Sequence, residues 1–428
     1  MRRLLLAALV VCSAFVVPGS SSGSSPGSSS AVYPTPGFAS ANVEWMGNLP
    51  IHADSAGARL LGDHLYITSS HELSIYDVKT DPLLPRLLST LPIPNTPYFA
   101  EEDVDTNGKV LLVGTATALV VVDVRNKALP VVSAVLQGAD EHTISCVLDC
   151  TWAYGSEGVI VDLRDPAAPK IAGDWTKALP AGVGQTHDVT EVSPGLVVTS
   201  TKTLWMLDAR KDPSKPKVVA SGASPDGRFI HANLWPRGGK DTMLLVGGET
   251  SGAGCSDPEG GAFMTWDATQ VSGRTAKTKR FRLLDSYRVP EATLQQGGAA
   301  VTETYCSHWF TTRPGWKDGG DVAIGWYENG TRFVDVSPKG KITQTGYFTP
   351  AGTSASAAYW VSKDLLYVLD YQRGLDILRF SDTPVTRSVR PGAPGLKPWE
   401  APATPRVFLP GLLNGTAWTC AAPVPAVA

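Results

Sequence analysis

Histidine is the residue type with the clearest chemical potential in this sequence. The chain has seven histidines, and four of them occupy one position of an internal repeat, where Glu102 takes the matching place in the preceding unit. Imidazole binds iron, copper, zinc or nickel, and a carboxylate shifts the preference towards iron or manganese. The set predicts one divalent transition-metal site, iron or copper being favoured and zinc or manganese being alternatives. Its predicted ligands are Glu102, His142, His187, His231 and His308.

Acidic residues adjoin several of these candidate ligands. A metal-bound histidine usually donates its other ring N–H to a carboxylate or carbonyl, so Asp103, Glu141 and Asp188 are the candidate outer partners. The alternative is that His-Asp pairs only tie a strand to its turn by hydrogen bonds. Against it, two repeat units have small residues there, near Ser55 and Ser356, so the repeat itself does not demand histidine. The sequence has no H-E-x-x-H string and no G-x-S-x-G nucleophile elbow, since its G-x-S-x-G matches lie only in the Gly/Ser stretch of residues 19–30.

A repeated apolar-Asp motif defines the elements that must position these residues. Each copy follows a second apolar run, and several precede a proline-bracketed turn such as Asp165-Pro166-Ala167-Ala168-Pro169. Three to four short strands in roughly 45 residues make one propeller blade. The six clear copies end at Asp77, Asp123, Asp162, Asp208, Asp267 and Asp335, and a degenerate seventh contains Asp376.

Seven units predict an all-β fold, a seven-bladed β-propeller over residues 42–380. The run from Asn42 to Met46 precedes the first unit. We expect it to supply the outer strand of the last blade, because an open ring would leave sheet edges unpaired. First strands line the central channel of a propeller. The five candidate ligands, which stand at the heads of successive first strands, should therefore converge at one channel mouth.

The blades carry a family resemblance. Their Leu-x-Val/Ile-x-Asp pattern with Asp-Pro-x-x-Pro turns resembles the LVIVD-repeat propellers of exported bacterial proteins, and residues 367–380 resemble the closing blade of actinobacterial members. The resemblance covers about residues 42–380 and implies the fold. It implies little about activity, because that family is defined by its repeat. Four axial histidines also occur in the seven-bladed carotenoid-cleaving oxygenases, which is an analogy of geometry and not of sequence.

The two ends of the chain have a different composition. A basic start, an apolar run from Leu4 to Val17 and a Gly/Ser stretch predict a signal peptide and Ser/Gly-rich segment over residues 1–31. The apolar run is too short to span a membrane, so we expect a secreted, extracellular protein. Residues 381–428 hold nine prolines and predict an irregular Pro-rich tail. The net charge of −3 gives no electrostatic argument for a nucleic-acid partner.

Cysteines are consistent with export to an oxidising compartment. Cys146 and Cys150 flank three residues between two strand-like runs, and a three-residue hairpin loop would place them opposite each other. This spacing predicts a disulfide; free core thiols or a redox pair are the alternatives. Cys255 and Cys306, both in the irregular part of the chain, are the next expected pair, which leaves Cys420 over.

Two classes of function remain open on these observations. The ligand set favours a metal-dependent enzyme of the oxidoreductase or oxygenase type. Such an enzyme would act on a small-molecule or cell-envelope ligand at the channel mouth. The lack of any other catalytic signature favours a non-catalytic extracellular propeller that binds a protein, glycan or cell-wall component. Metal analysis of the purified protein separates the two classes.

Overall fold

The computed structural model describes residues 39–52, 55–69, 71–94, 104–181, 183, 186–224, 230–248, 261–272, 279–289, 306–327 and 329–383, and the backbone at 408–409 and 422–423. All of these lie in one compact unit, Pro34–Ala428. The predicted signal segment and most of the Pro-rich tail lie outside the described residues. Within the tail, β29 (Phe408–Leu409) pairs antiparallel with β30 (Ala422–Pro423).

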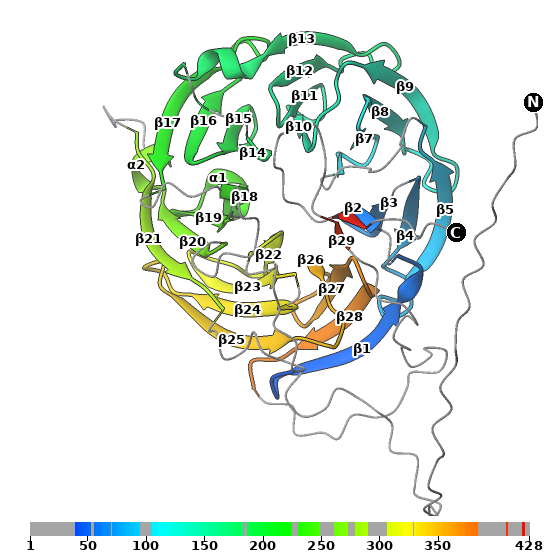
Figure 1. Cartoon of the computed structure of the whole chain (residues 1–428), viewed down its shortest axis with the longest axis vertical. Helices are drawn as coiled ribbons and strands as arrows, with labels where there is room; N and C mark the ends of the chain where they lie inside the picture. Colours follow the sequence, from blue (N-terminus) through cyan, green and yellow to red (C-terminus); the bar gives the residue numbers. More distant parts are fainter. Residues whose placement is uncertain are drawn as a thin grey trace, which may run out of the picture. The chain divides into compact units, whose positions relative to one another are not determined.

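Seven four-stranded antiparallel sheets follow one another in a ring, which confirms the seven-bladed propeller (Figure 1). Blade 1 consists of β2 (Ser55–Leu61), β3 (His64–Ser69), β4 (Glu72–Asp77) and β5 (Arg86–Pro92), and blade 2 of β6 (Asp105–Thr106), β7 (Val110–Gly114), β8 (Ala118–Asp123) and β9 (Val131–Gln137). Blade 3 consists of β10 (Ile144–Val147), β11 (Trp152–Gly155), β12 (Val159–Asp162) and β13 (Lys170–Asp174), and blade 4 of β14 (Asp188–Ser193), β15 (Leu196–Ser200), β16 (Thr203–Asp208) and β17 (Lys217–Ala223).

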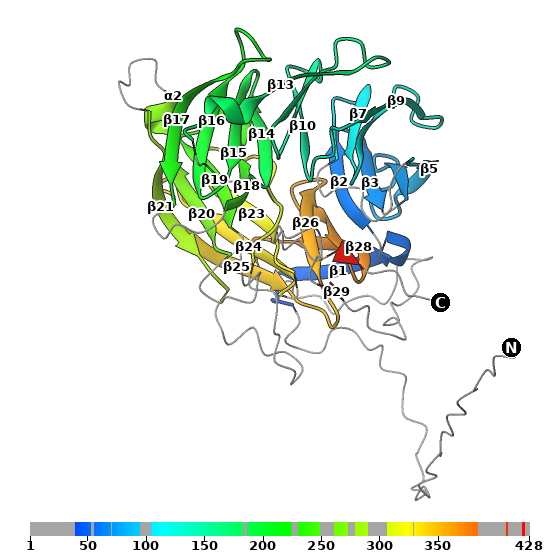
Figure 2. The same cartoon turned by 45° about the horizontal axis from the view of Figure 1, so that its top comes forward.

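Blade 5 consists of β18 (Ile230–Leu234), β19 (Met243–Gly248), β20 (Phe263–Asp267) and β21 (Arg282–Tyr287). Blade 6 consists of β22 (Phe310–Thr312), β23 (Gly320–Gly325), β24 (Thr331–Val336) and β25 (Ile342–Phe348). Blade 7 consists of β26 (Ala355–Trp360), β27 (Leu365–Asp370), β28 (Gly374–Phe380) and β1 (Val43–Leu49). The described helices are single turns: η1 (Pro50–His52), η2 (Trp175–Ala178), α1 (Pro236–Gly239) and α2 (Thr269–Ser272). Figure 2 shows the outer strands β17 and β21 on one flank and β5 and β9 on the other. None of the helices described is long and apolar enough to cross a membrane.

The motif aspartate is the last residue of the third strand in the first five blades, and in blade 6 one more strand residue, Val336, follows Asp335. The motif carboxylates of Asp123, Asp162 and Asp208 each accept a hydrogen bond from the backbone N–H two residues further on. Each also pairs with the arginine at that position. The aspartate thus starts the turn that leads into the outer strand, so its recurrence is a property of the fold and not of a site.

Polar side chains on the inner strands bind the next blade. Asp105 on β6 accepts a hydrogen bond from Cys146 N on β10 at 2.9 Å, and Asp188 on β14 accepts from Asn233 N on β18 at 3.3 Å. These N–H groups belong to the inner edge strands, which have no further strand to pair with. The carboxylates therefore satisfy donors that would otherwise be buried without a partner.

The ring is closed by the N-terminal strand, as the sequence predicts. β1 pairs antiparallel with β28, from Val43 opposite Phe380 to Leu49 opposite Leu375. In Figure 1, β1 lies beside β28 although the two are separated by almost the whole propeller sequence. The strand runs three residues beyond the predicted Met46, because its register continues through a bulge between Trp45 and Gly47.

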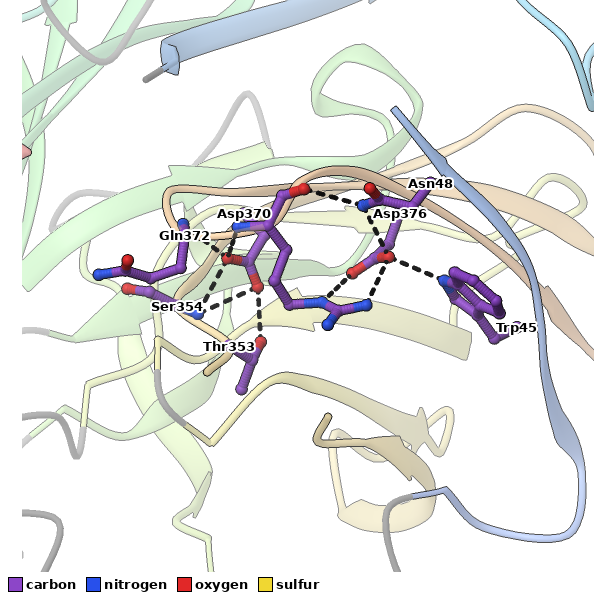
Figure 3. Close-up of polar contacts among 8 residues, drawn as sticks. Trp45, Asn48, Thr353, Ser354, Asp370, Gln372 and Asp376 are labelled. Atoms are coloured by element: carbon purple, nitrogen blue, oxygen red, sulfur yellow. Dashed lines mark hydrogen bonds and ion pairs between the residues drawn. The ribbon is translucent and has the colours of Figure 1, made fainter. Parts of the chain in front are cut away.

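A buried ion pair holds this closure (Figure 3). Arg373 Nε donates to Asp376 Oδ2 at 2.7 Å, and the two side chains are 3% and 1% exposed. Asp376 Oδ1 also accepts hydrogen bonds from two β1 side chains, Trp45 Nε1 at 2.8 Å and Asn48 Nδ2 at 3.0 Å. Asp376 is therefore not a turn-starting residue like its counterparts. It lies within β28 and bonds to the closing strand.

The predicted disulfide between Cys146 and Cys150 is present, with Cα atoms 4.4 Å apart. The expectation that the two cysteines sit opposite each other in the hairpin is wrong: Cys146 pairs with Ala153. Leu148, Asp149 and Cys150 all have left-handed φ values of 52° to 57°, which turn Cys150 back towards Cys146. Cys306 is also disulfide-bonded. Its predicted partner Cys255 lies outside the described residues, so that pairing stays a prediction.

We expect the Cys146–Cys150 disulfide to add only modest stability. The chain-entropy model gives about 2 kcal/mol for a loop this short. Replacing both cysteines with serine should lower the free energy of unfolding in urea by about that amount and leave the far-ultraviolet circular dichroism unchanged. A loss of more than about 4 kcal/mol would show that the left-handed turn collapses without the bond.

Candidate functional site

Four histidines from four successive blades meet in one row. His142 precedes β10, His187 precedes β14, His231 lies in β18, and His308 precedes β22. The Nε2 atoms of His142 and His187 are 2.9 Å apart, and the centres of these two rings are 4.6 Å apart. The next ring centres are separated by 3.9 Å (His187 to His231) and 4.2 Å (His231 to His308). We call these four residues the histidine row.

The row is buried at one end of its length and partly open at the other. His187, His231 and His308 are fully buried, whereas His142 is half-buried. Hydrogen bonds of the inner strands position His187. Thr143 Oγ1 of blade 3 donates to His187 O at 2.8 Å, and within blade 4 His187 N donates to Ser200 O at 3.0 Å. His142 is therefore the member of the row with the largest exposed fraction.

His308 has an orienting partner that the sequence did not reveal. Its Nδ1 lies 2.8 Å from the backbone oxygen of Ser356 at the head of blade 7. A carbonyl oxygen can only accept, so the proton of the neutral ring is on Nδ1 and the lone pair is on Nε2. A histidine that donates one ring N–H to a carbonyl is the arrangement found for metal-ligating histidines. Ser356 stands where a histidine stands in the other blades, and it contributes its backbone.

Two tyrosines continue the row beyond His308. The Tyr327 ring centre lies 4.6 Å from that of His308, and the Tyr371 ring centre lies 6.4 Å from it. Both tyrosines are buried and pack with Cys306. They begin the turns after β23 and β27, the second strands of blades 6 and 7. Aligning those turns on the repeat would have placed them at the same mouth. Tyr327 has a left-handed φ of 43°, an uncommon conformation for a bulky side chain.

The other predicted site residues have different positions. Glu102 and Asp103 lie outside the described residues. Glu141 is buried and accepts hydrogen bonds from the backbone N–H groups of Glu157 and Val159, and burial raises its pKa to about 8. Burial likewise raises the pKa of Asp188 to about 7. Asp188 accepts a hydrogen bond from Thr190 Oγ1 of its own strand. It also accepts hydrogen bonds from Asn233 of β18, which join blade 4 to blade 5. Support of the histidines by these acids stays a prediction.

The fit of the row to a metal can be tested on its ring spacing. Two imidazoles bound at right angles to one metal, each through a nitrogen about 2.1 Å away, have ring centres about 4.6 Å apart. The His142–His187 pair has this spacing, whereas the next two pairs are closer. In the part of the chain that the structure describes, no group of three or more His, Cys, Asp or Glu side chains is arranged as a formed metal site. Only the His142–His187 pair therefore has the spacing of two ligands of one metal, and the stacked rings would have to turn apart to surround one.

Fold and site together define a seven-bladed β-propeller with four histidines and two tyrosines gathered in one row of rings across five blades. No protein-family model matches the chain, and no curated protein matches it. The resemblance to LVIVD-repeat propellers therefore stays a prediction.

Proposed function

We propose that this protein binds a divalent transition metal through the histidine row and acts as a metal-dependent enzyme outside the cytoplasm. The observation that carries the proposal is the convergence of four imidazoles from four blades, with two Nε2 atoms 2.9 Å apart. The blades themselves do not require histidine at these places, since blade 7 has Ser356 there and closes normally. A bound metal supplies a Lewis acid and lowers the pKa of coordinated water.

The residues around the row suit such a site. His308 is held by the Ser356 carbonyl with its lone pair on Nε2. Tyr327 and Tyr371 cover the His308 end with buried rings and so keep water from that side. His142, the half-buried member, faces the side from which a small-molecule or cell-envelope ligand would enter. Iron or copper suits a histidine-rich set, and zinc or manganese are the alternatives.

Two disulfide-bonded sites, Cys146–Cys150 and Cys306, support an oxidising compartment. Together with the apolar N-terminal run they support our proposal that the protein is exported. Periplasmic or culture-supernatant fractionation of the native host, with non-reducing mass spectrometry of the Cys146–Cys150 peptide, tests this part.

The metal proposal predicts the effect of single histidine substitutions. His187→Ala should lower metal affinity more than about 100-fold, because loss of an outer partner alone typically costs 10–100-fold. The variant should stay folded, since the ring is packed by seven apolar blade interfaces. The measurement is elemental analysis after chelation and reconstitution with Fe(II), Cu(II), Zn(II) or Mn(II). Affinity should also fall as the pH falls, because only neutral imidazole is a ligand.

His64→Ala and His71→Ala are the matched controls. Both residues lie in blade 1 outside the histidine row, so metal content should be unchanged in each. The proposal is refuted if the reconstituted wild-type protein holds no metal. It is also refuted if His187→Ala keeps wild-type occupancy. If His187→Ala unfolds a protein that never holds metal, the row is a structural stack of rings.

A further inference from the structure

Arg332 is a buried cation that the histidine row does not explain. It lies on β24, the third strand of blade 6, and is 0% exposed. Val334 and Val336, two and four residues further on, pack with Phe263 of blade 5. Side chains of a strand alternate between its faces, so Arg332 also points into the interface between blades 5 and 6.

The guanidinium group of Arg332 has unmet hydrogen-bonding capacity. Its Nε, Nη1 and Nη2 atoms are all buried, and none has a hydrogen-bond partner within the described residues. By contrast, the half-buried guanidinium of Arg313 on the same blade is paired with Asp321 and Asp382. Buried charges are normally paired and hydrogen-bonded, because desolvation of a lone ion is costly. Among the residues that the structure describes, Arg332 therefore has no anionic partner.

Neighbouring aromatic rings stabilise the positive charge of Arg332 but do not accept its hydrogen bonds. The guanidinium carbon lies 5.4 Å from the Tyr347 ring centre, in cation–π contact. Tyr287, whose hydroxyl donates to Gln344 Oε1, lies on the blade 5 side and packs against Trp326. Burial lowers the pKa of Arg332 to about 10, so the group stays charged at neutral pH. A π face attracts the charge but accepts none of the five N–H bonds in the guanidinium plane.

We propose that Arg332 binds a small oxyanion between blades 5 and 6. The fork of N–H donors matches two oxygens of one carboxylate, sulfate or phosphate group. The buried guanidinium has no open space beside it, so the anion would enter as the neighbouring Tyr287 and Tyr347 rings move apart, and it would neutralise the buried charge of Arg332. This oxyanion site is independent of the metal proposed above: it uses no histidine and is tested on chelated protein.

The experiment compares thermal unfolding of chelator-treated protein in sodium formate, sodium sulfate and sodium chloride at equal ionic strength, after prolonged incubation. Formate probes a planar carboxylate and sulfate a tetrahedral oxyanion. At least one should raise the wild-type midpoint by several degrees above chloride, because a ligand that binds only the folded state stabilises it by mass action. Arg332→Met should abolish the oxyanion-specific shift, and Arg332→Lys should weaken it.

Arg313→Met is the matched control, since it removes an arginine of the same blade whose charge is already paired. It should keep the full oxyanion-specific shift. The proposal is overturned if neither oxyanion exceeds chloride in the wild-type protein, or if Arg332→Met still shows the shift. Should Arg332→Met fail to fold, Arg332→Lys decides alone, and an undiminished shift in that variant also overturns the proposal.

Discussion

Asp376→Asn should lower the free energy of unfolding by about 3 kcal/mol or more. The substitution leaves Arg373 buried beside a neutral amide, and breaking one partner of a buried ion pair costs about 3–5 kcal/mol. We expect the lower end of this range of free energies because Asp370 also attracts the Arg373 charge. Asp376 further accepts from Trp45 and Asn48 of the closing strand, so the loss falls on the contact between the two ends of the ring.

Asp162→Asn is the control for this prediction. Asp162 pairs with Arg164, but that arginine side chain is 69% exposed, and exposed pairs contribute about 0–1 kcal/mol. The asparagine can still accept the turn hydrogen bond from Arg164 N, as Asp162 does. Urea unfolding of both variants at pH 7 gives the comparison. Equal stability of the two variants would show that the buried pair does not secure the ring.

The fold was predictable because its sequence signal is local and repeated. An apolar run that ends in aspartate marks the third strand of a blade, and the structure shows why: the aspartate starts the next turn, as Asp123, Asp162 and Asp208 do. The closing strand followed from the need to pair an open edge. The disulfide followed from sequence spacing, although its turn geometry did not, since three consecutive left-handed residues cannot be read from their types.

The site was predictable only in part, because only those of its residues that share a repeat position could be located from the sequence. The histidines could be found because they occupy one repeat position, so the fold fixes where they meet. No sequence motif marks Tyr327 and Tyr371, and only an alignment of the turns after the second strands of blades 6 and 7 would have placed them at the site. Ser356 contributes a backbone oxygen, which its side-chain type cannot reveal. Arg332 looks like a solvent-facing strand residue in sequence, but β24 is buried on both faces at that point.

Gly374→Ala should also weaken the ring at its closure, by about 2–5 kcal/mol. Gly374 begins β28 with φ at +92°, and a Cβ there would lie 2.3 Å from Leu49 O and 2.9 Å from Pro50 Cα. The backbone strain of an alanine with positive φ costs roughly 1–2 kcal/mol, and forcing apart packed atoms adds about 1–3 kcal/mol. The displaced atoms belong to the end of the closing strand, so amide exchange in β1 should accelerate.

Gly352→Ala separates backbone strain from this contact. Gly352 also has a left-handed φ, +68°, but nothing lies within 4 Å of a Cβ at that position. This variant should lose only about 1–2 kcal/mol from strain, with amide exchange in β1 unchanged. The difference between the two free energies of unfolding then measures what the close approach of Leu49 and Pro50 to β28 contributes. If both variants lose the same stability and β1 exchanges normally in each, the glycine is needed for its turn alone, and the ring closes through the strand pairing and the Arg373–Asp376 pair.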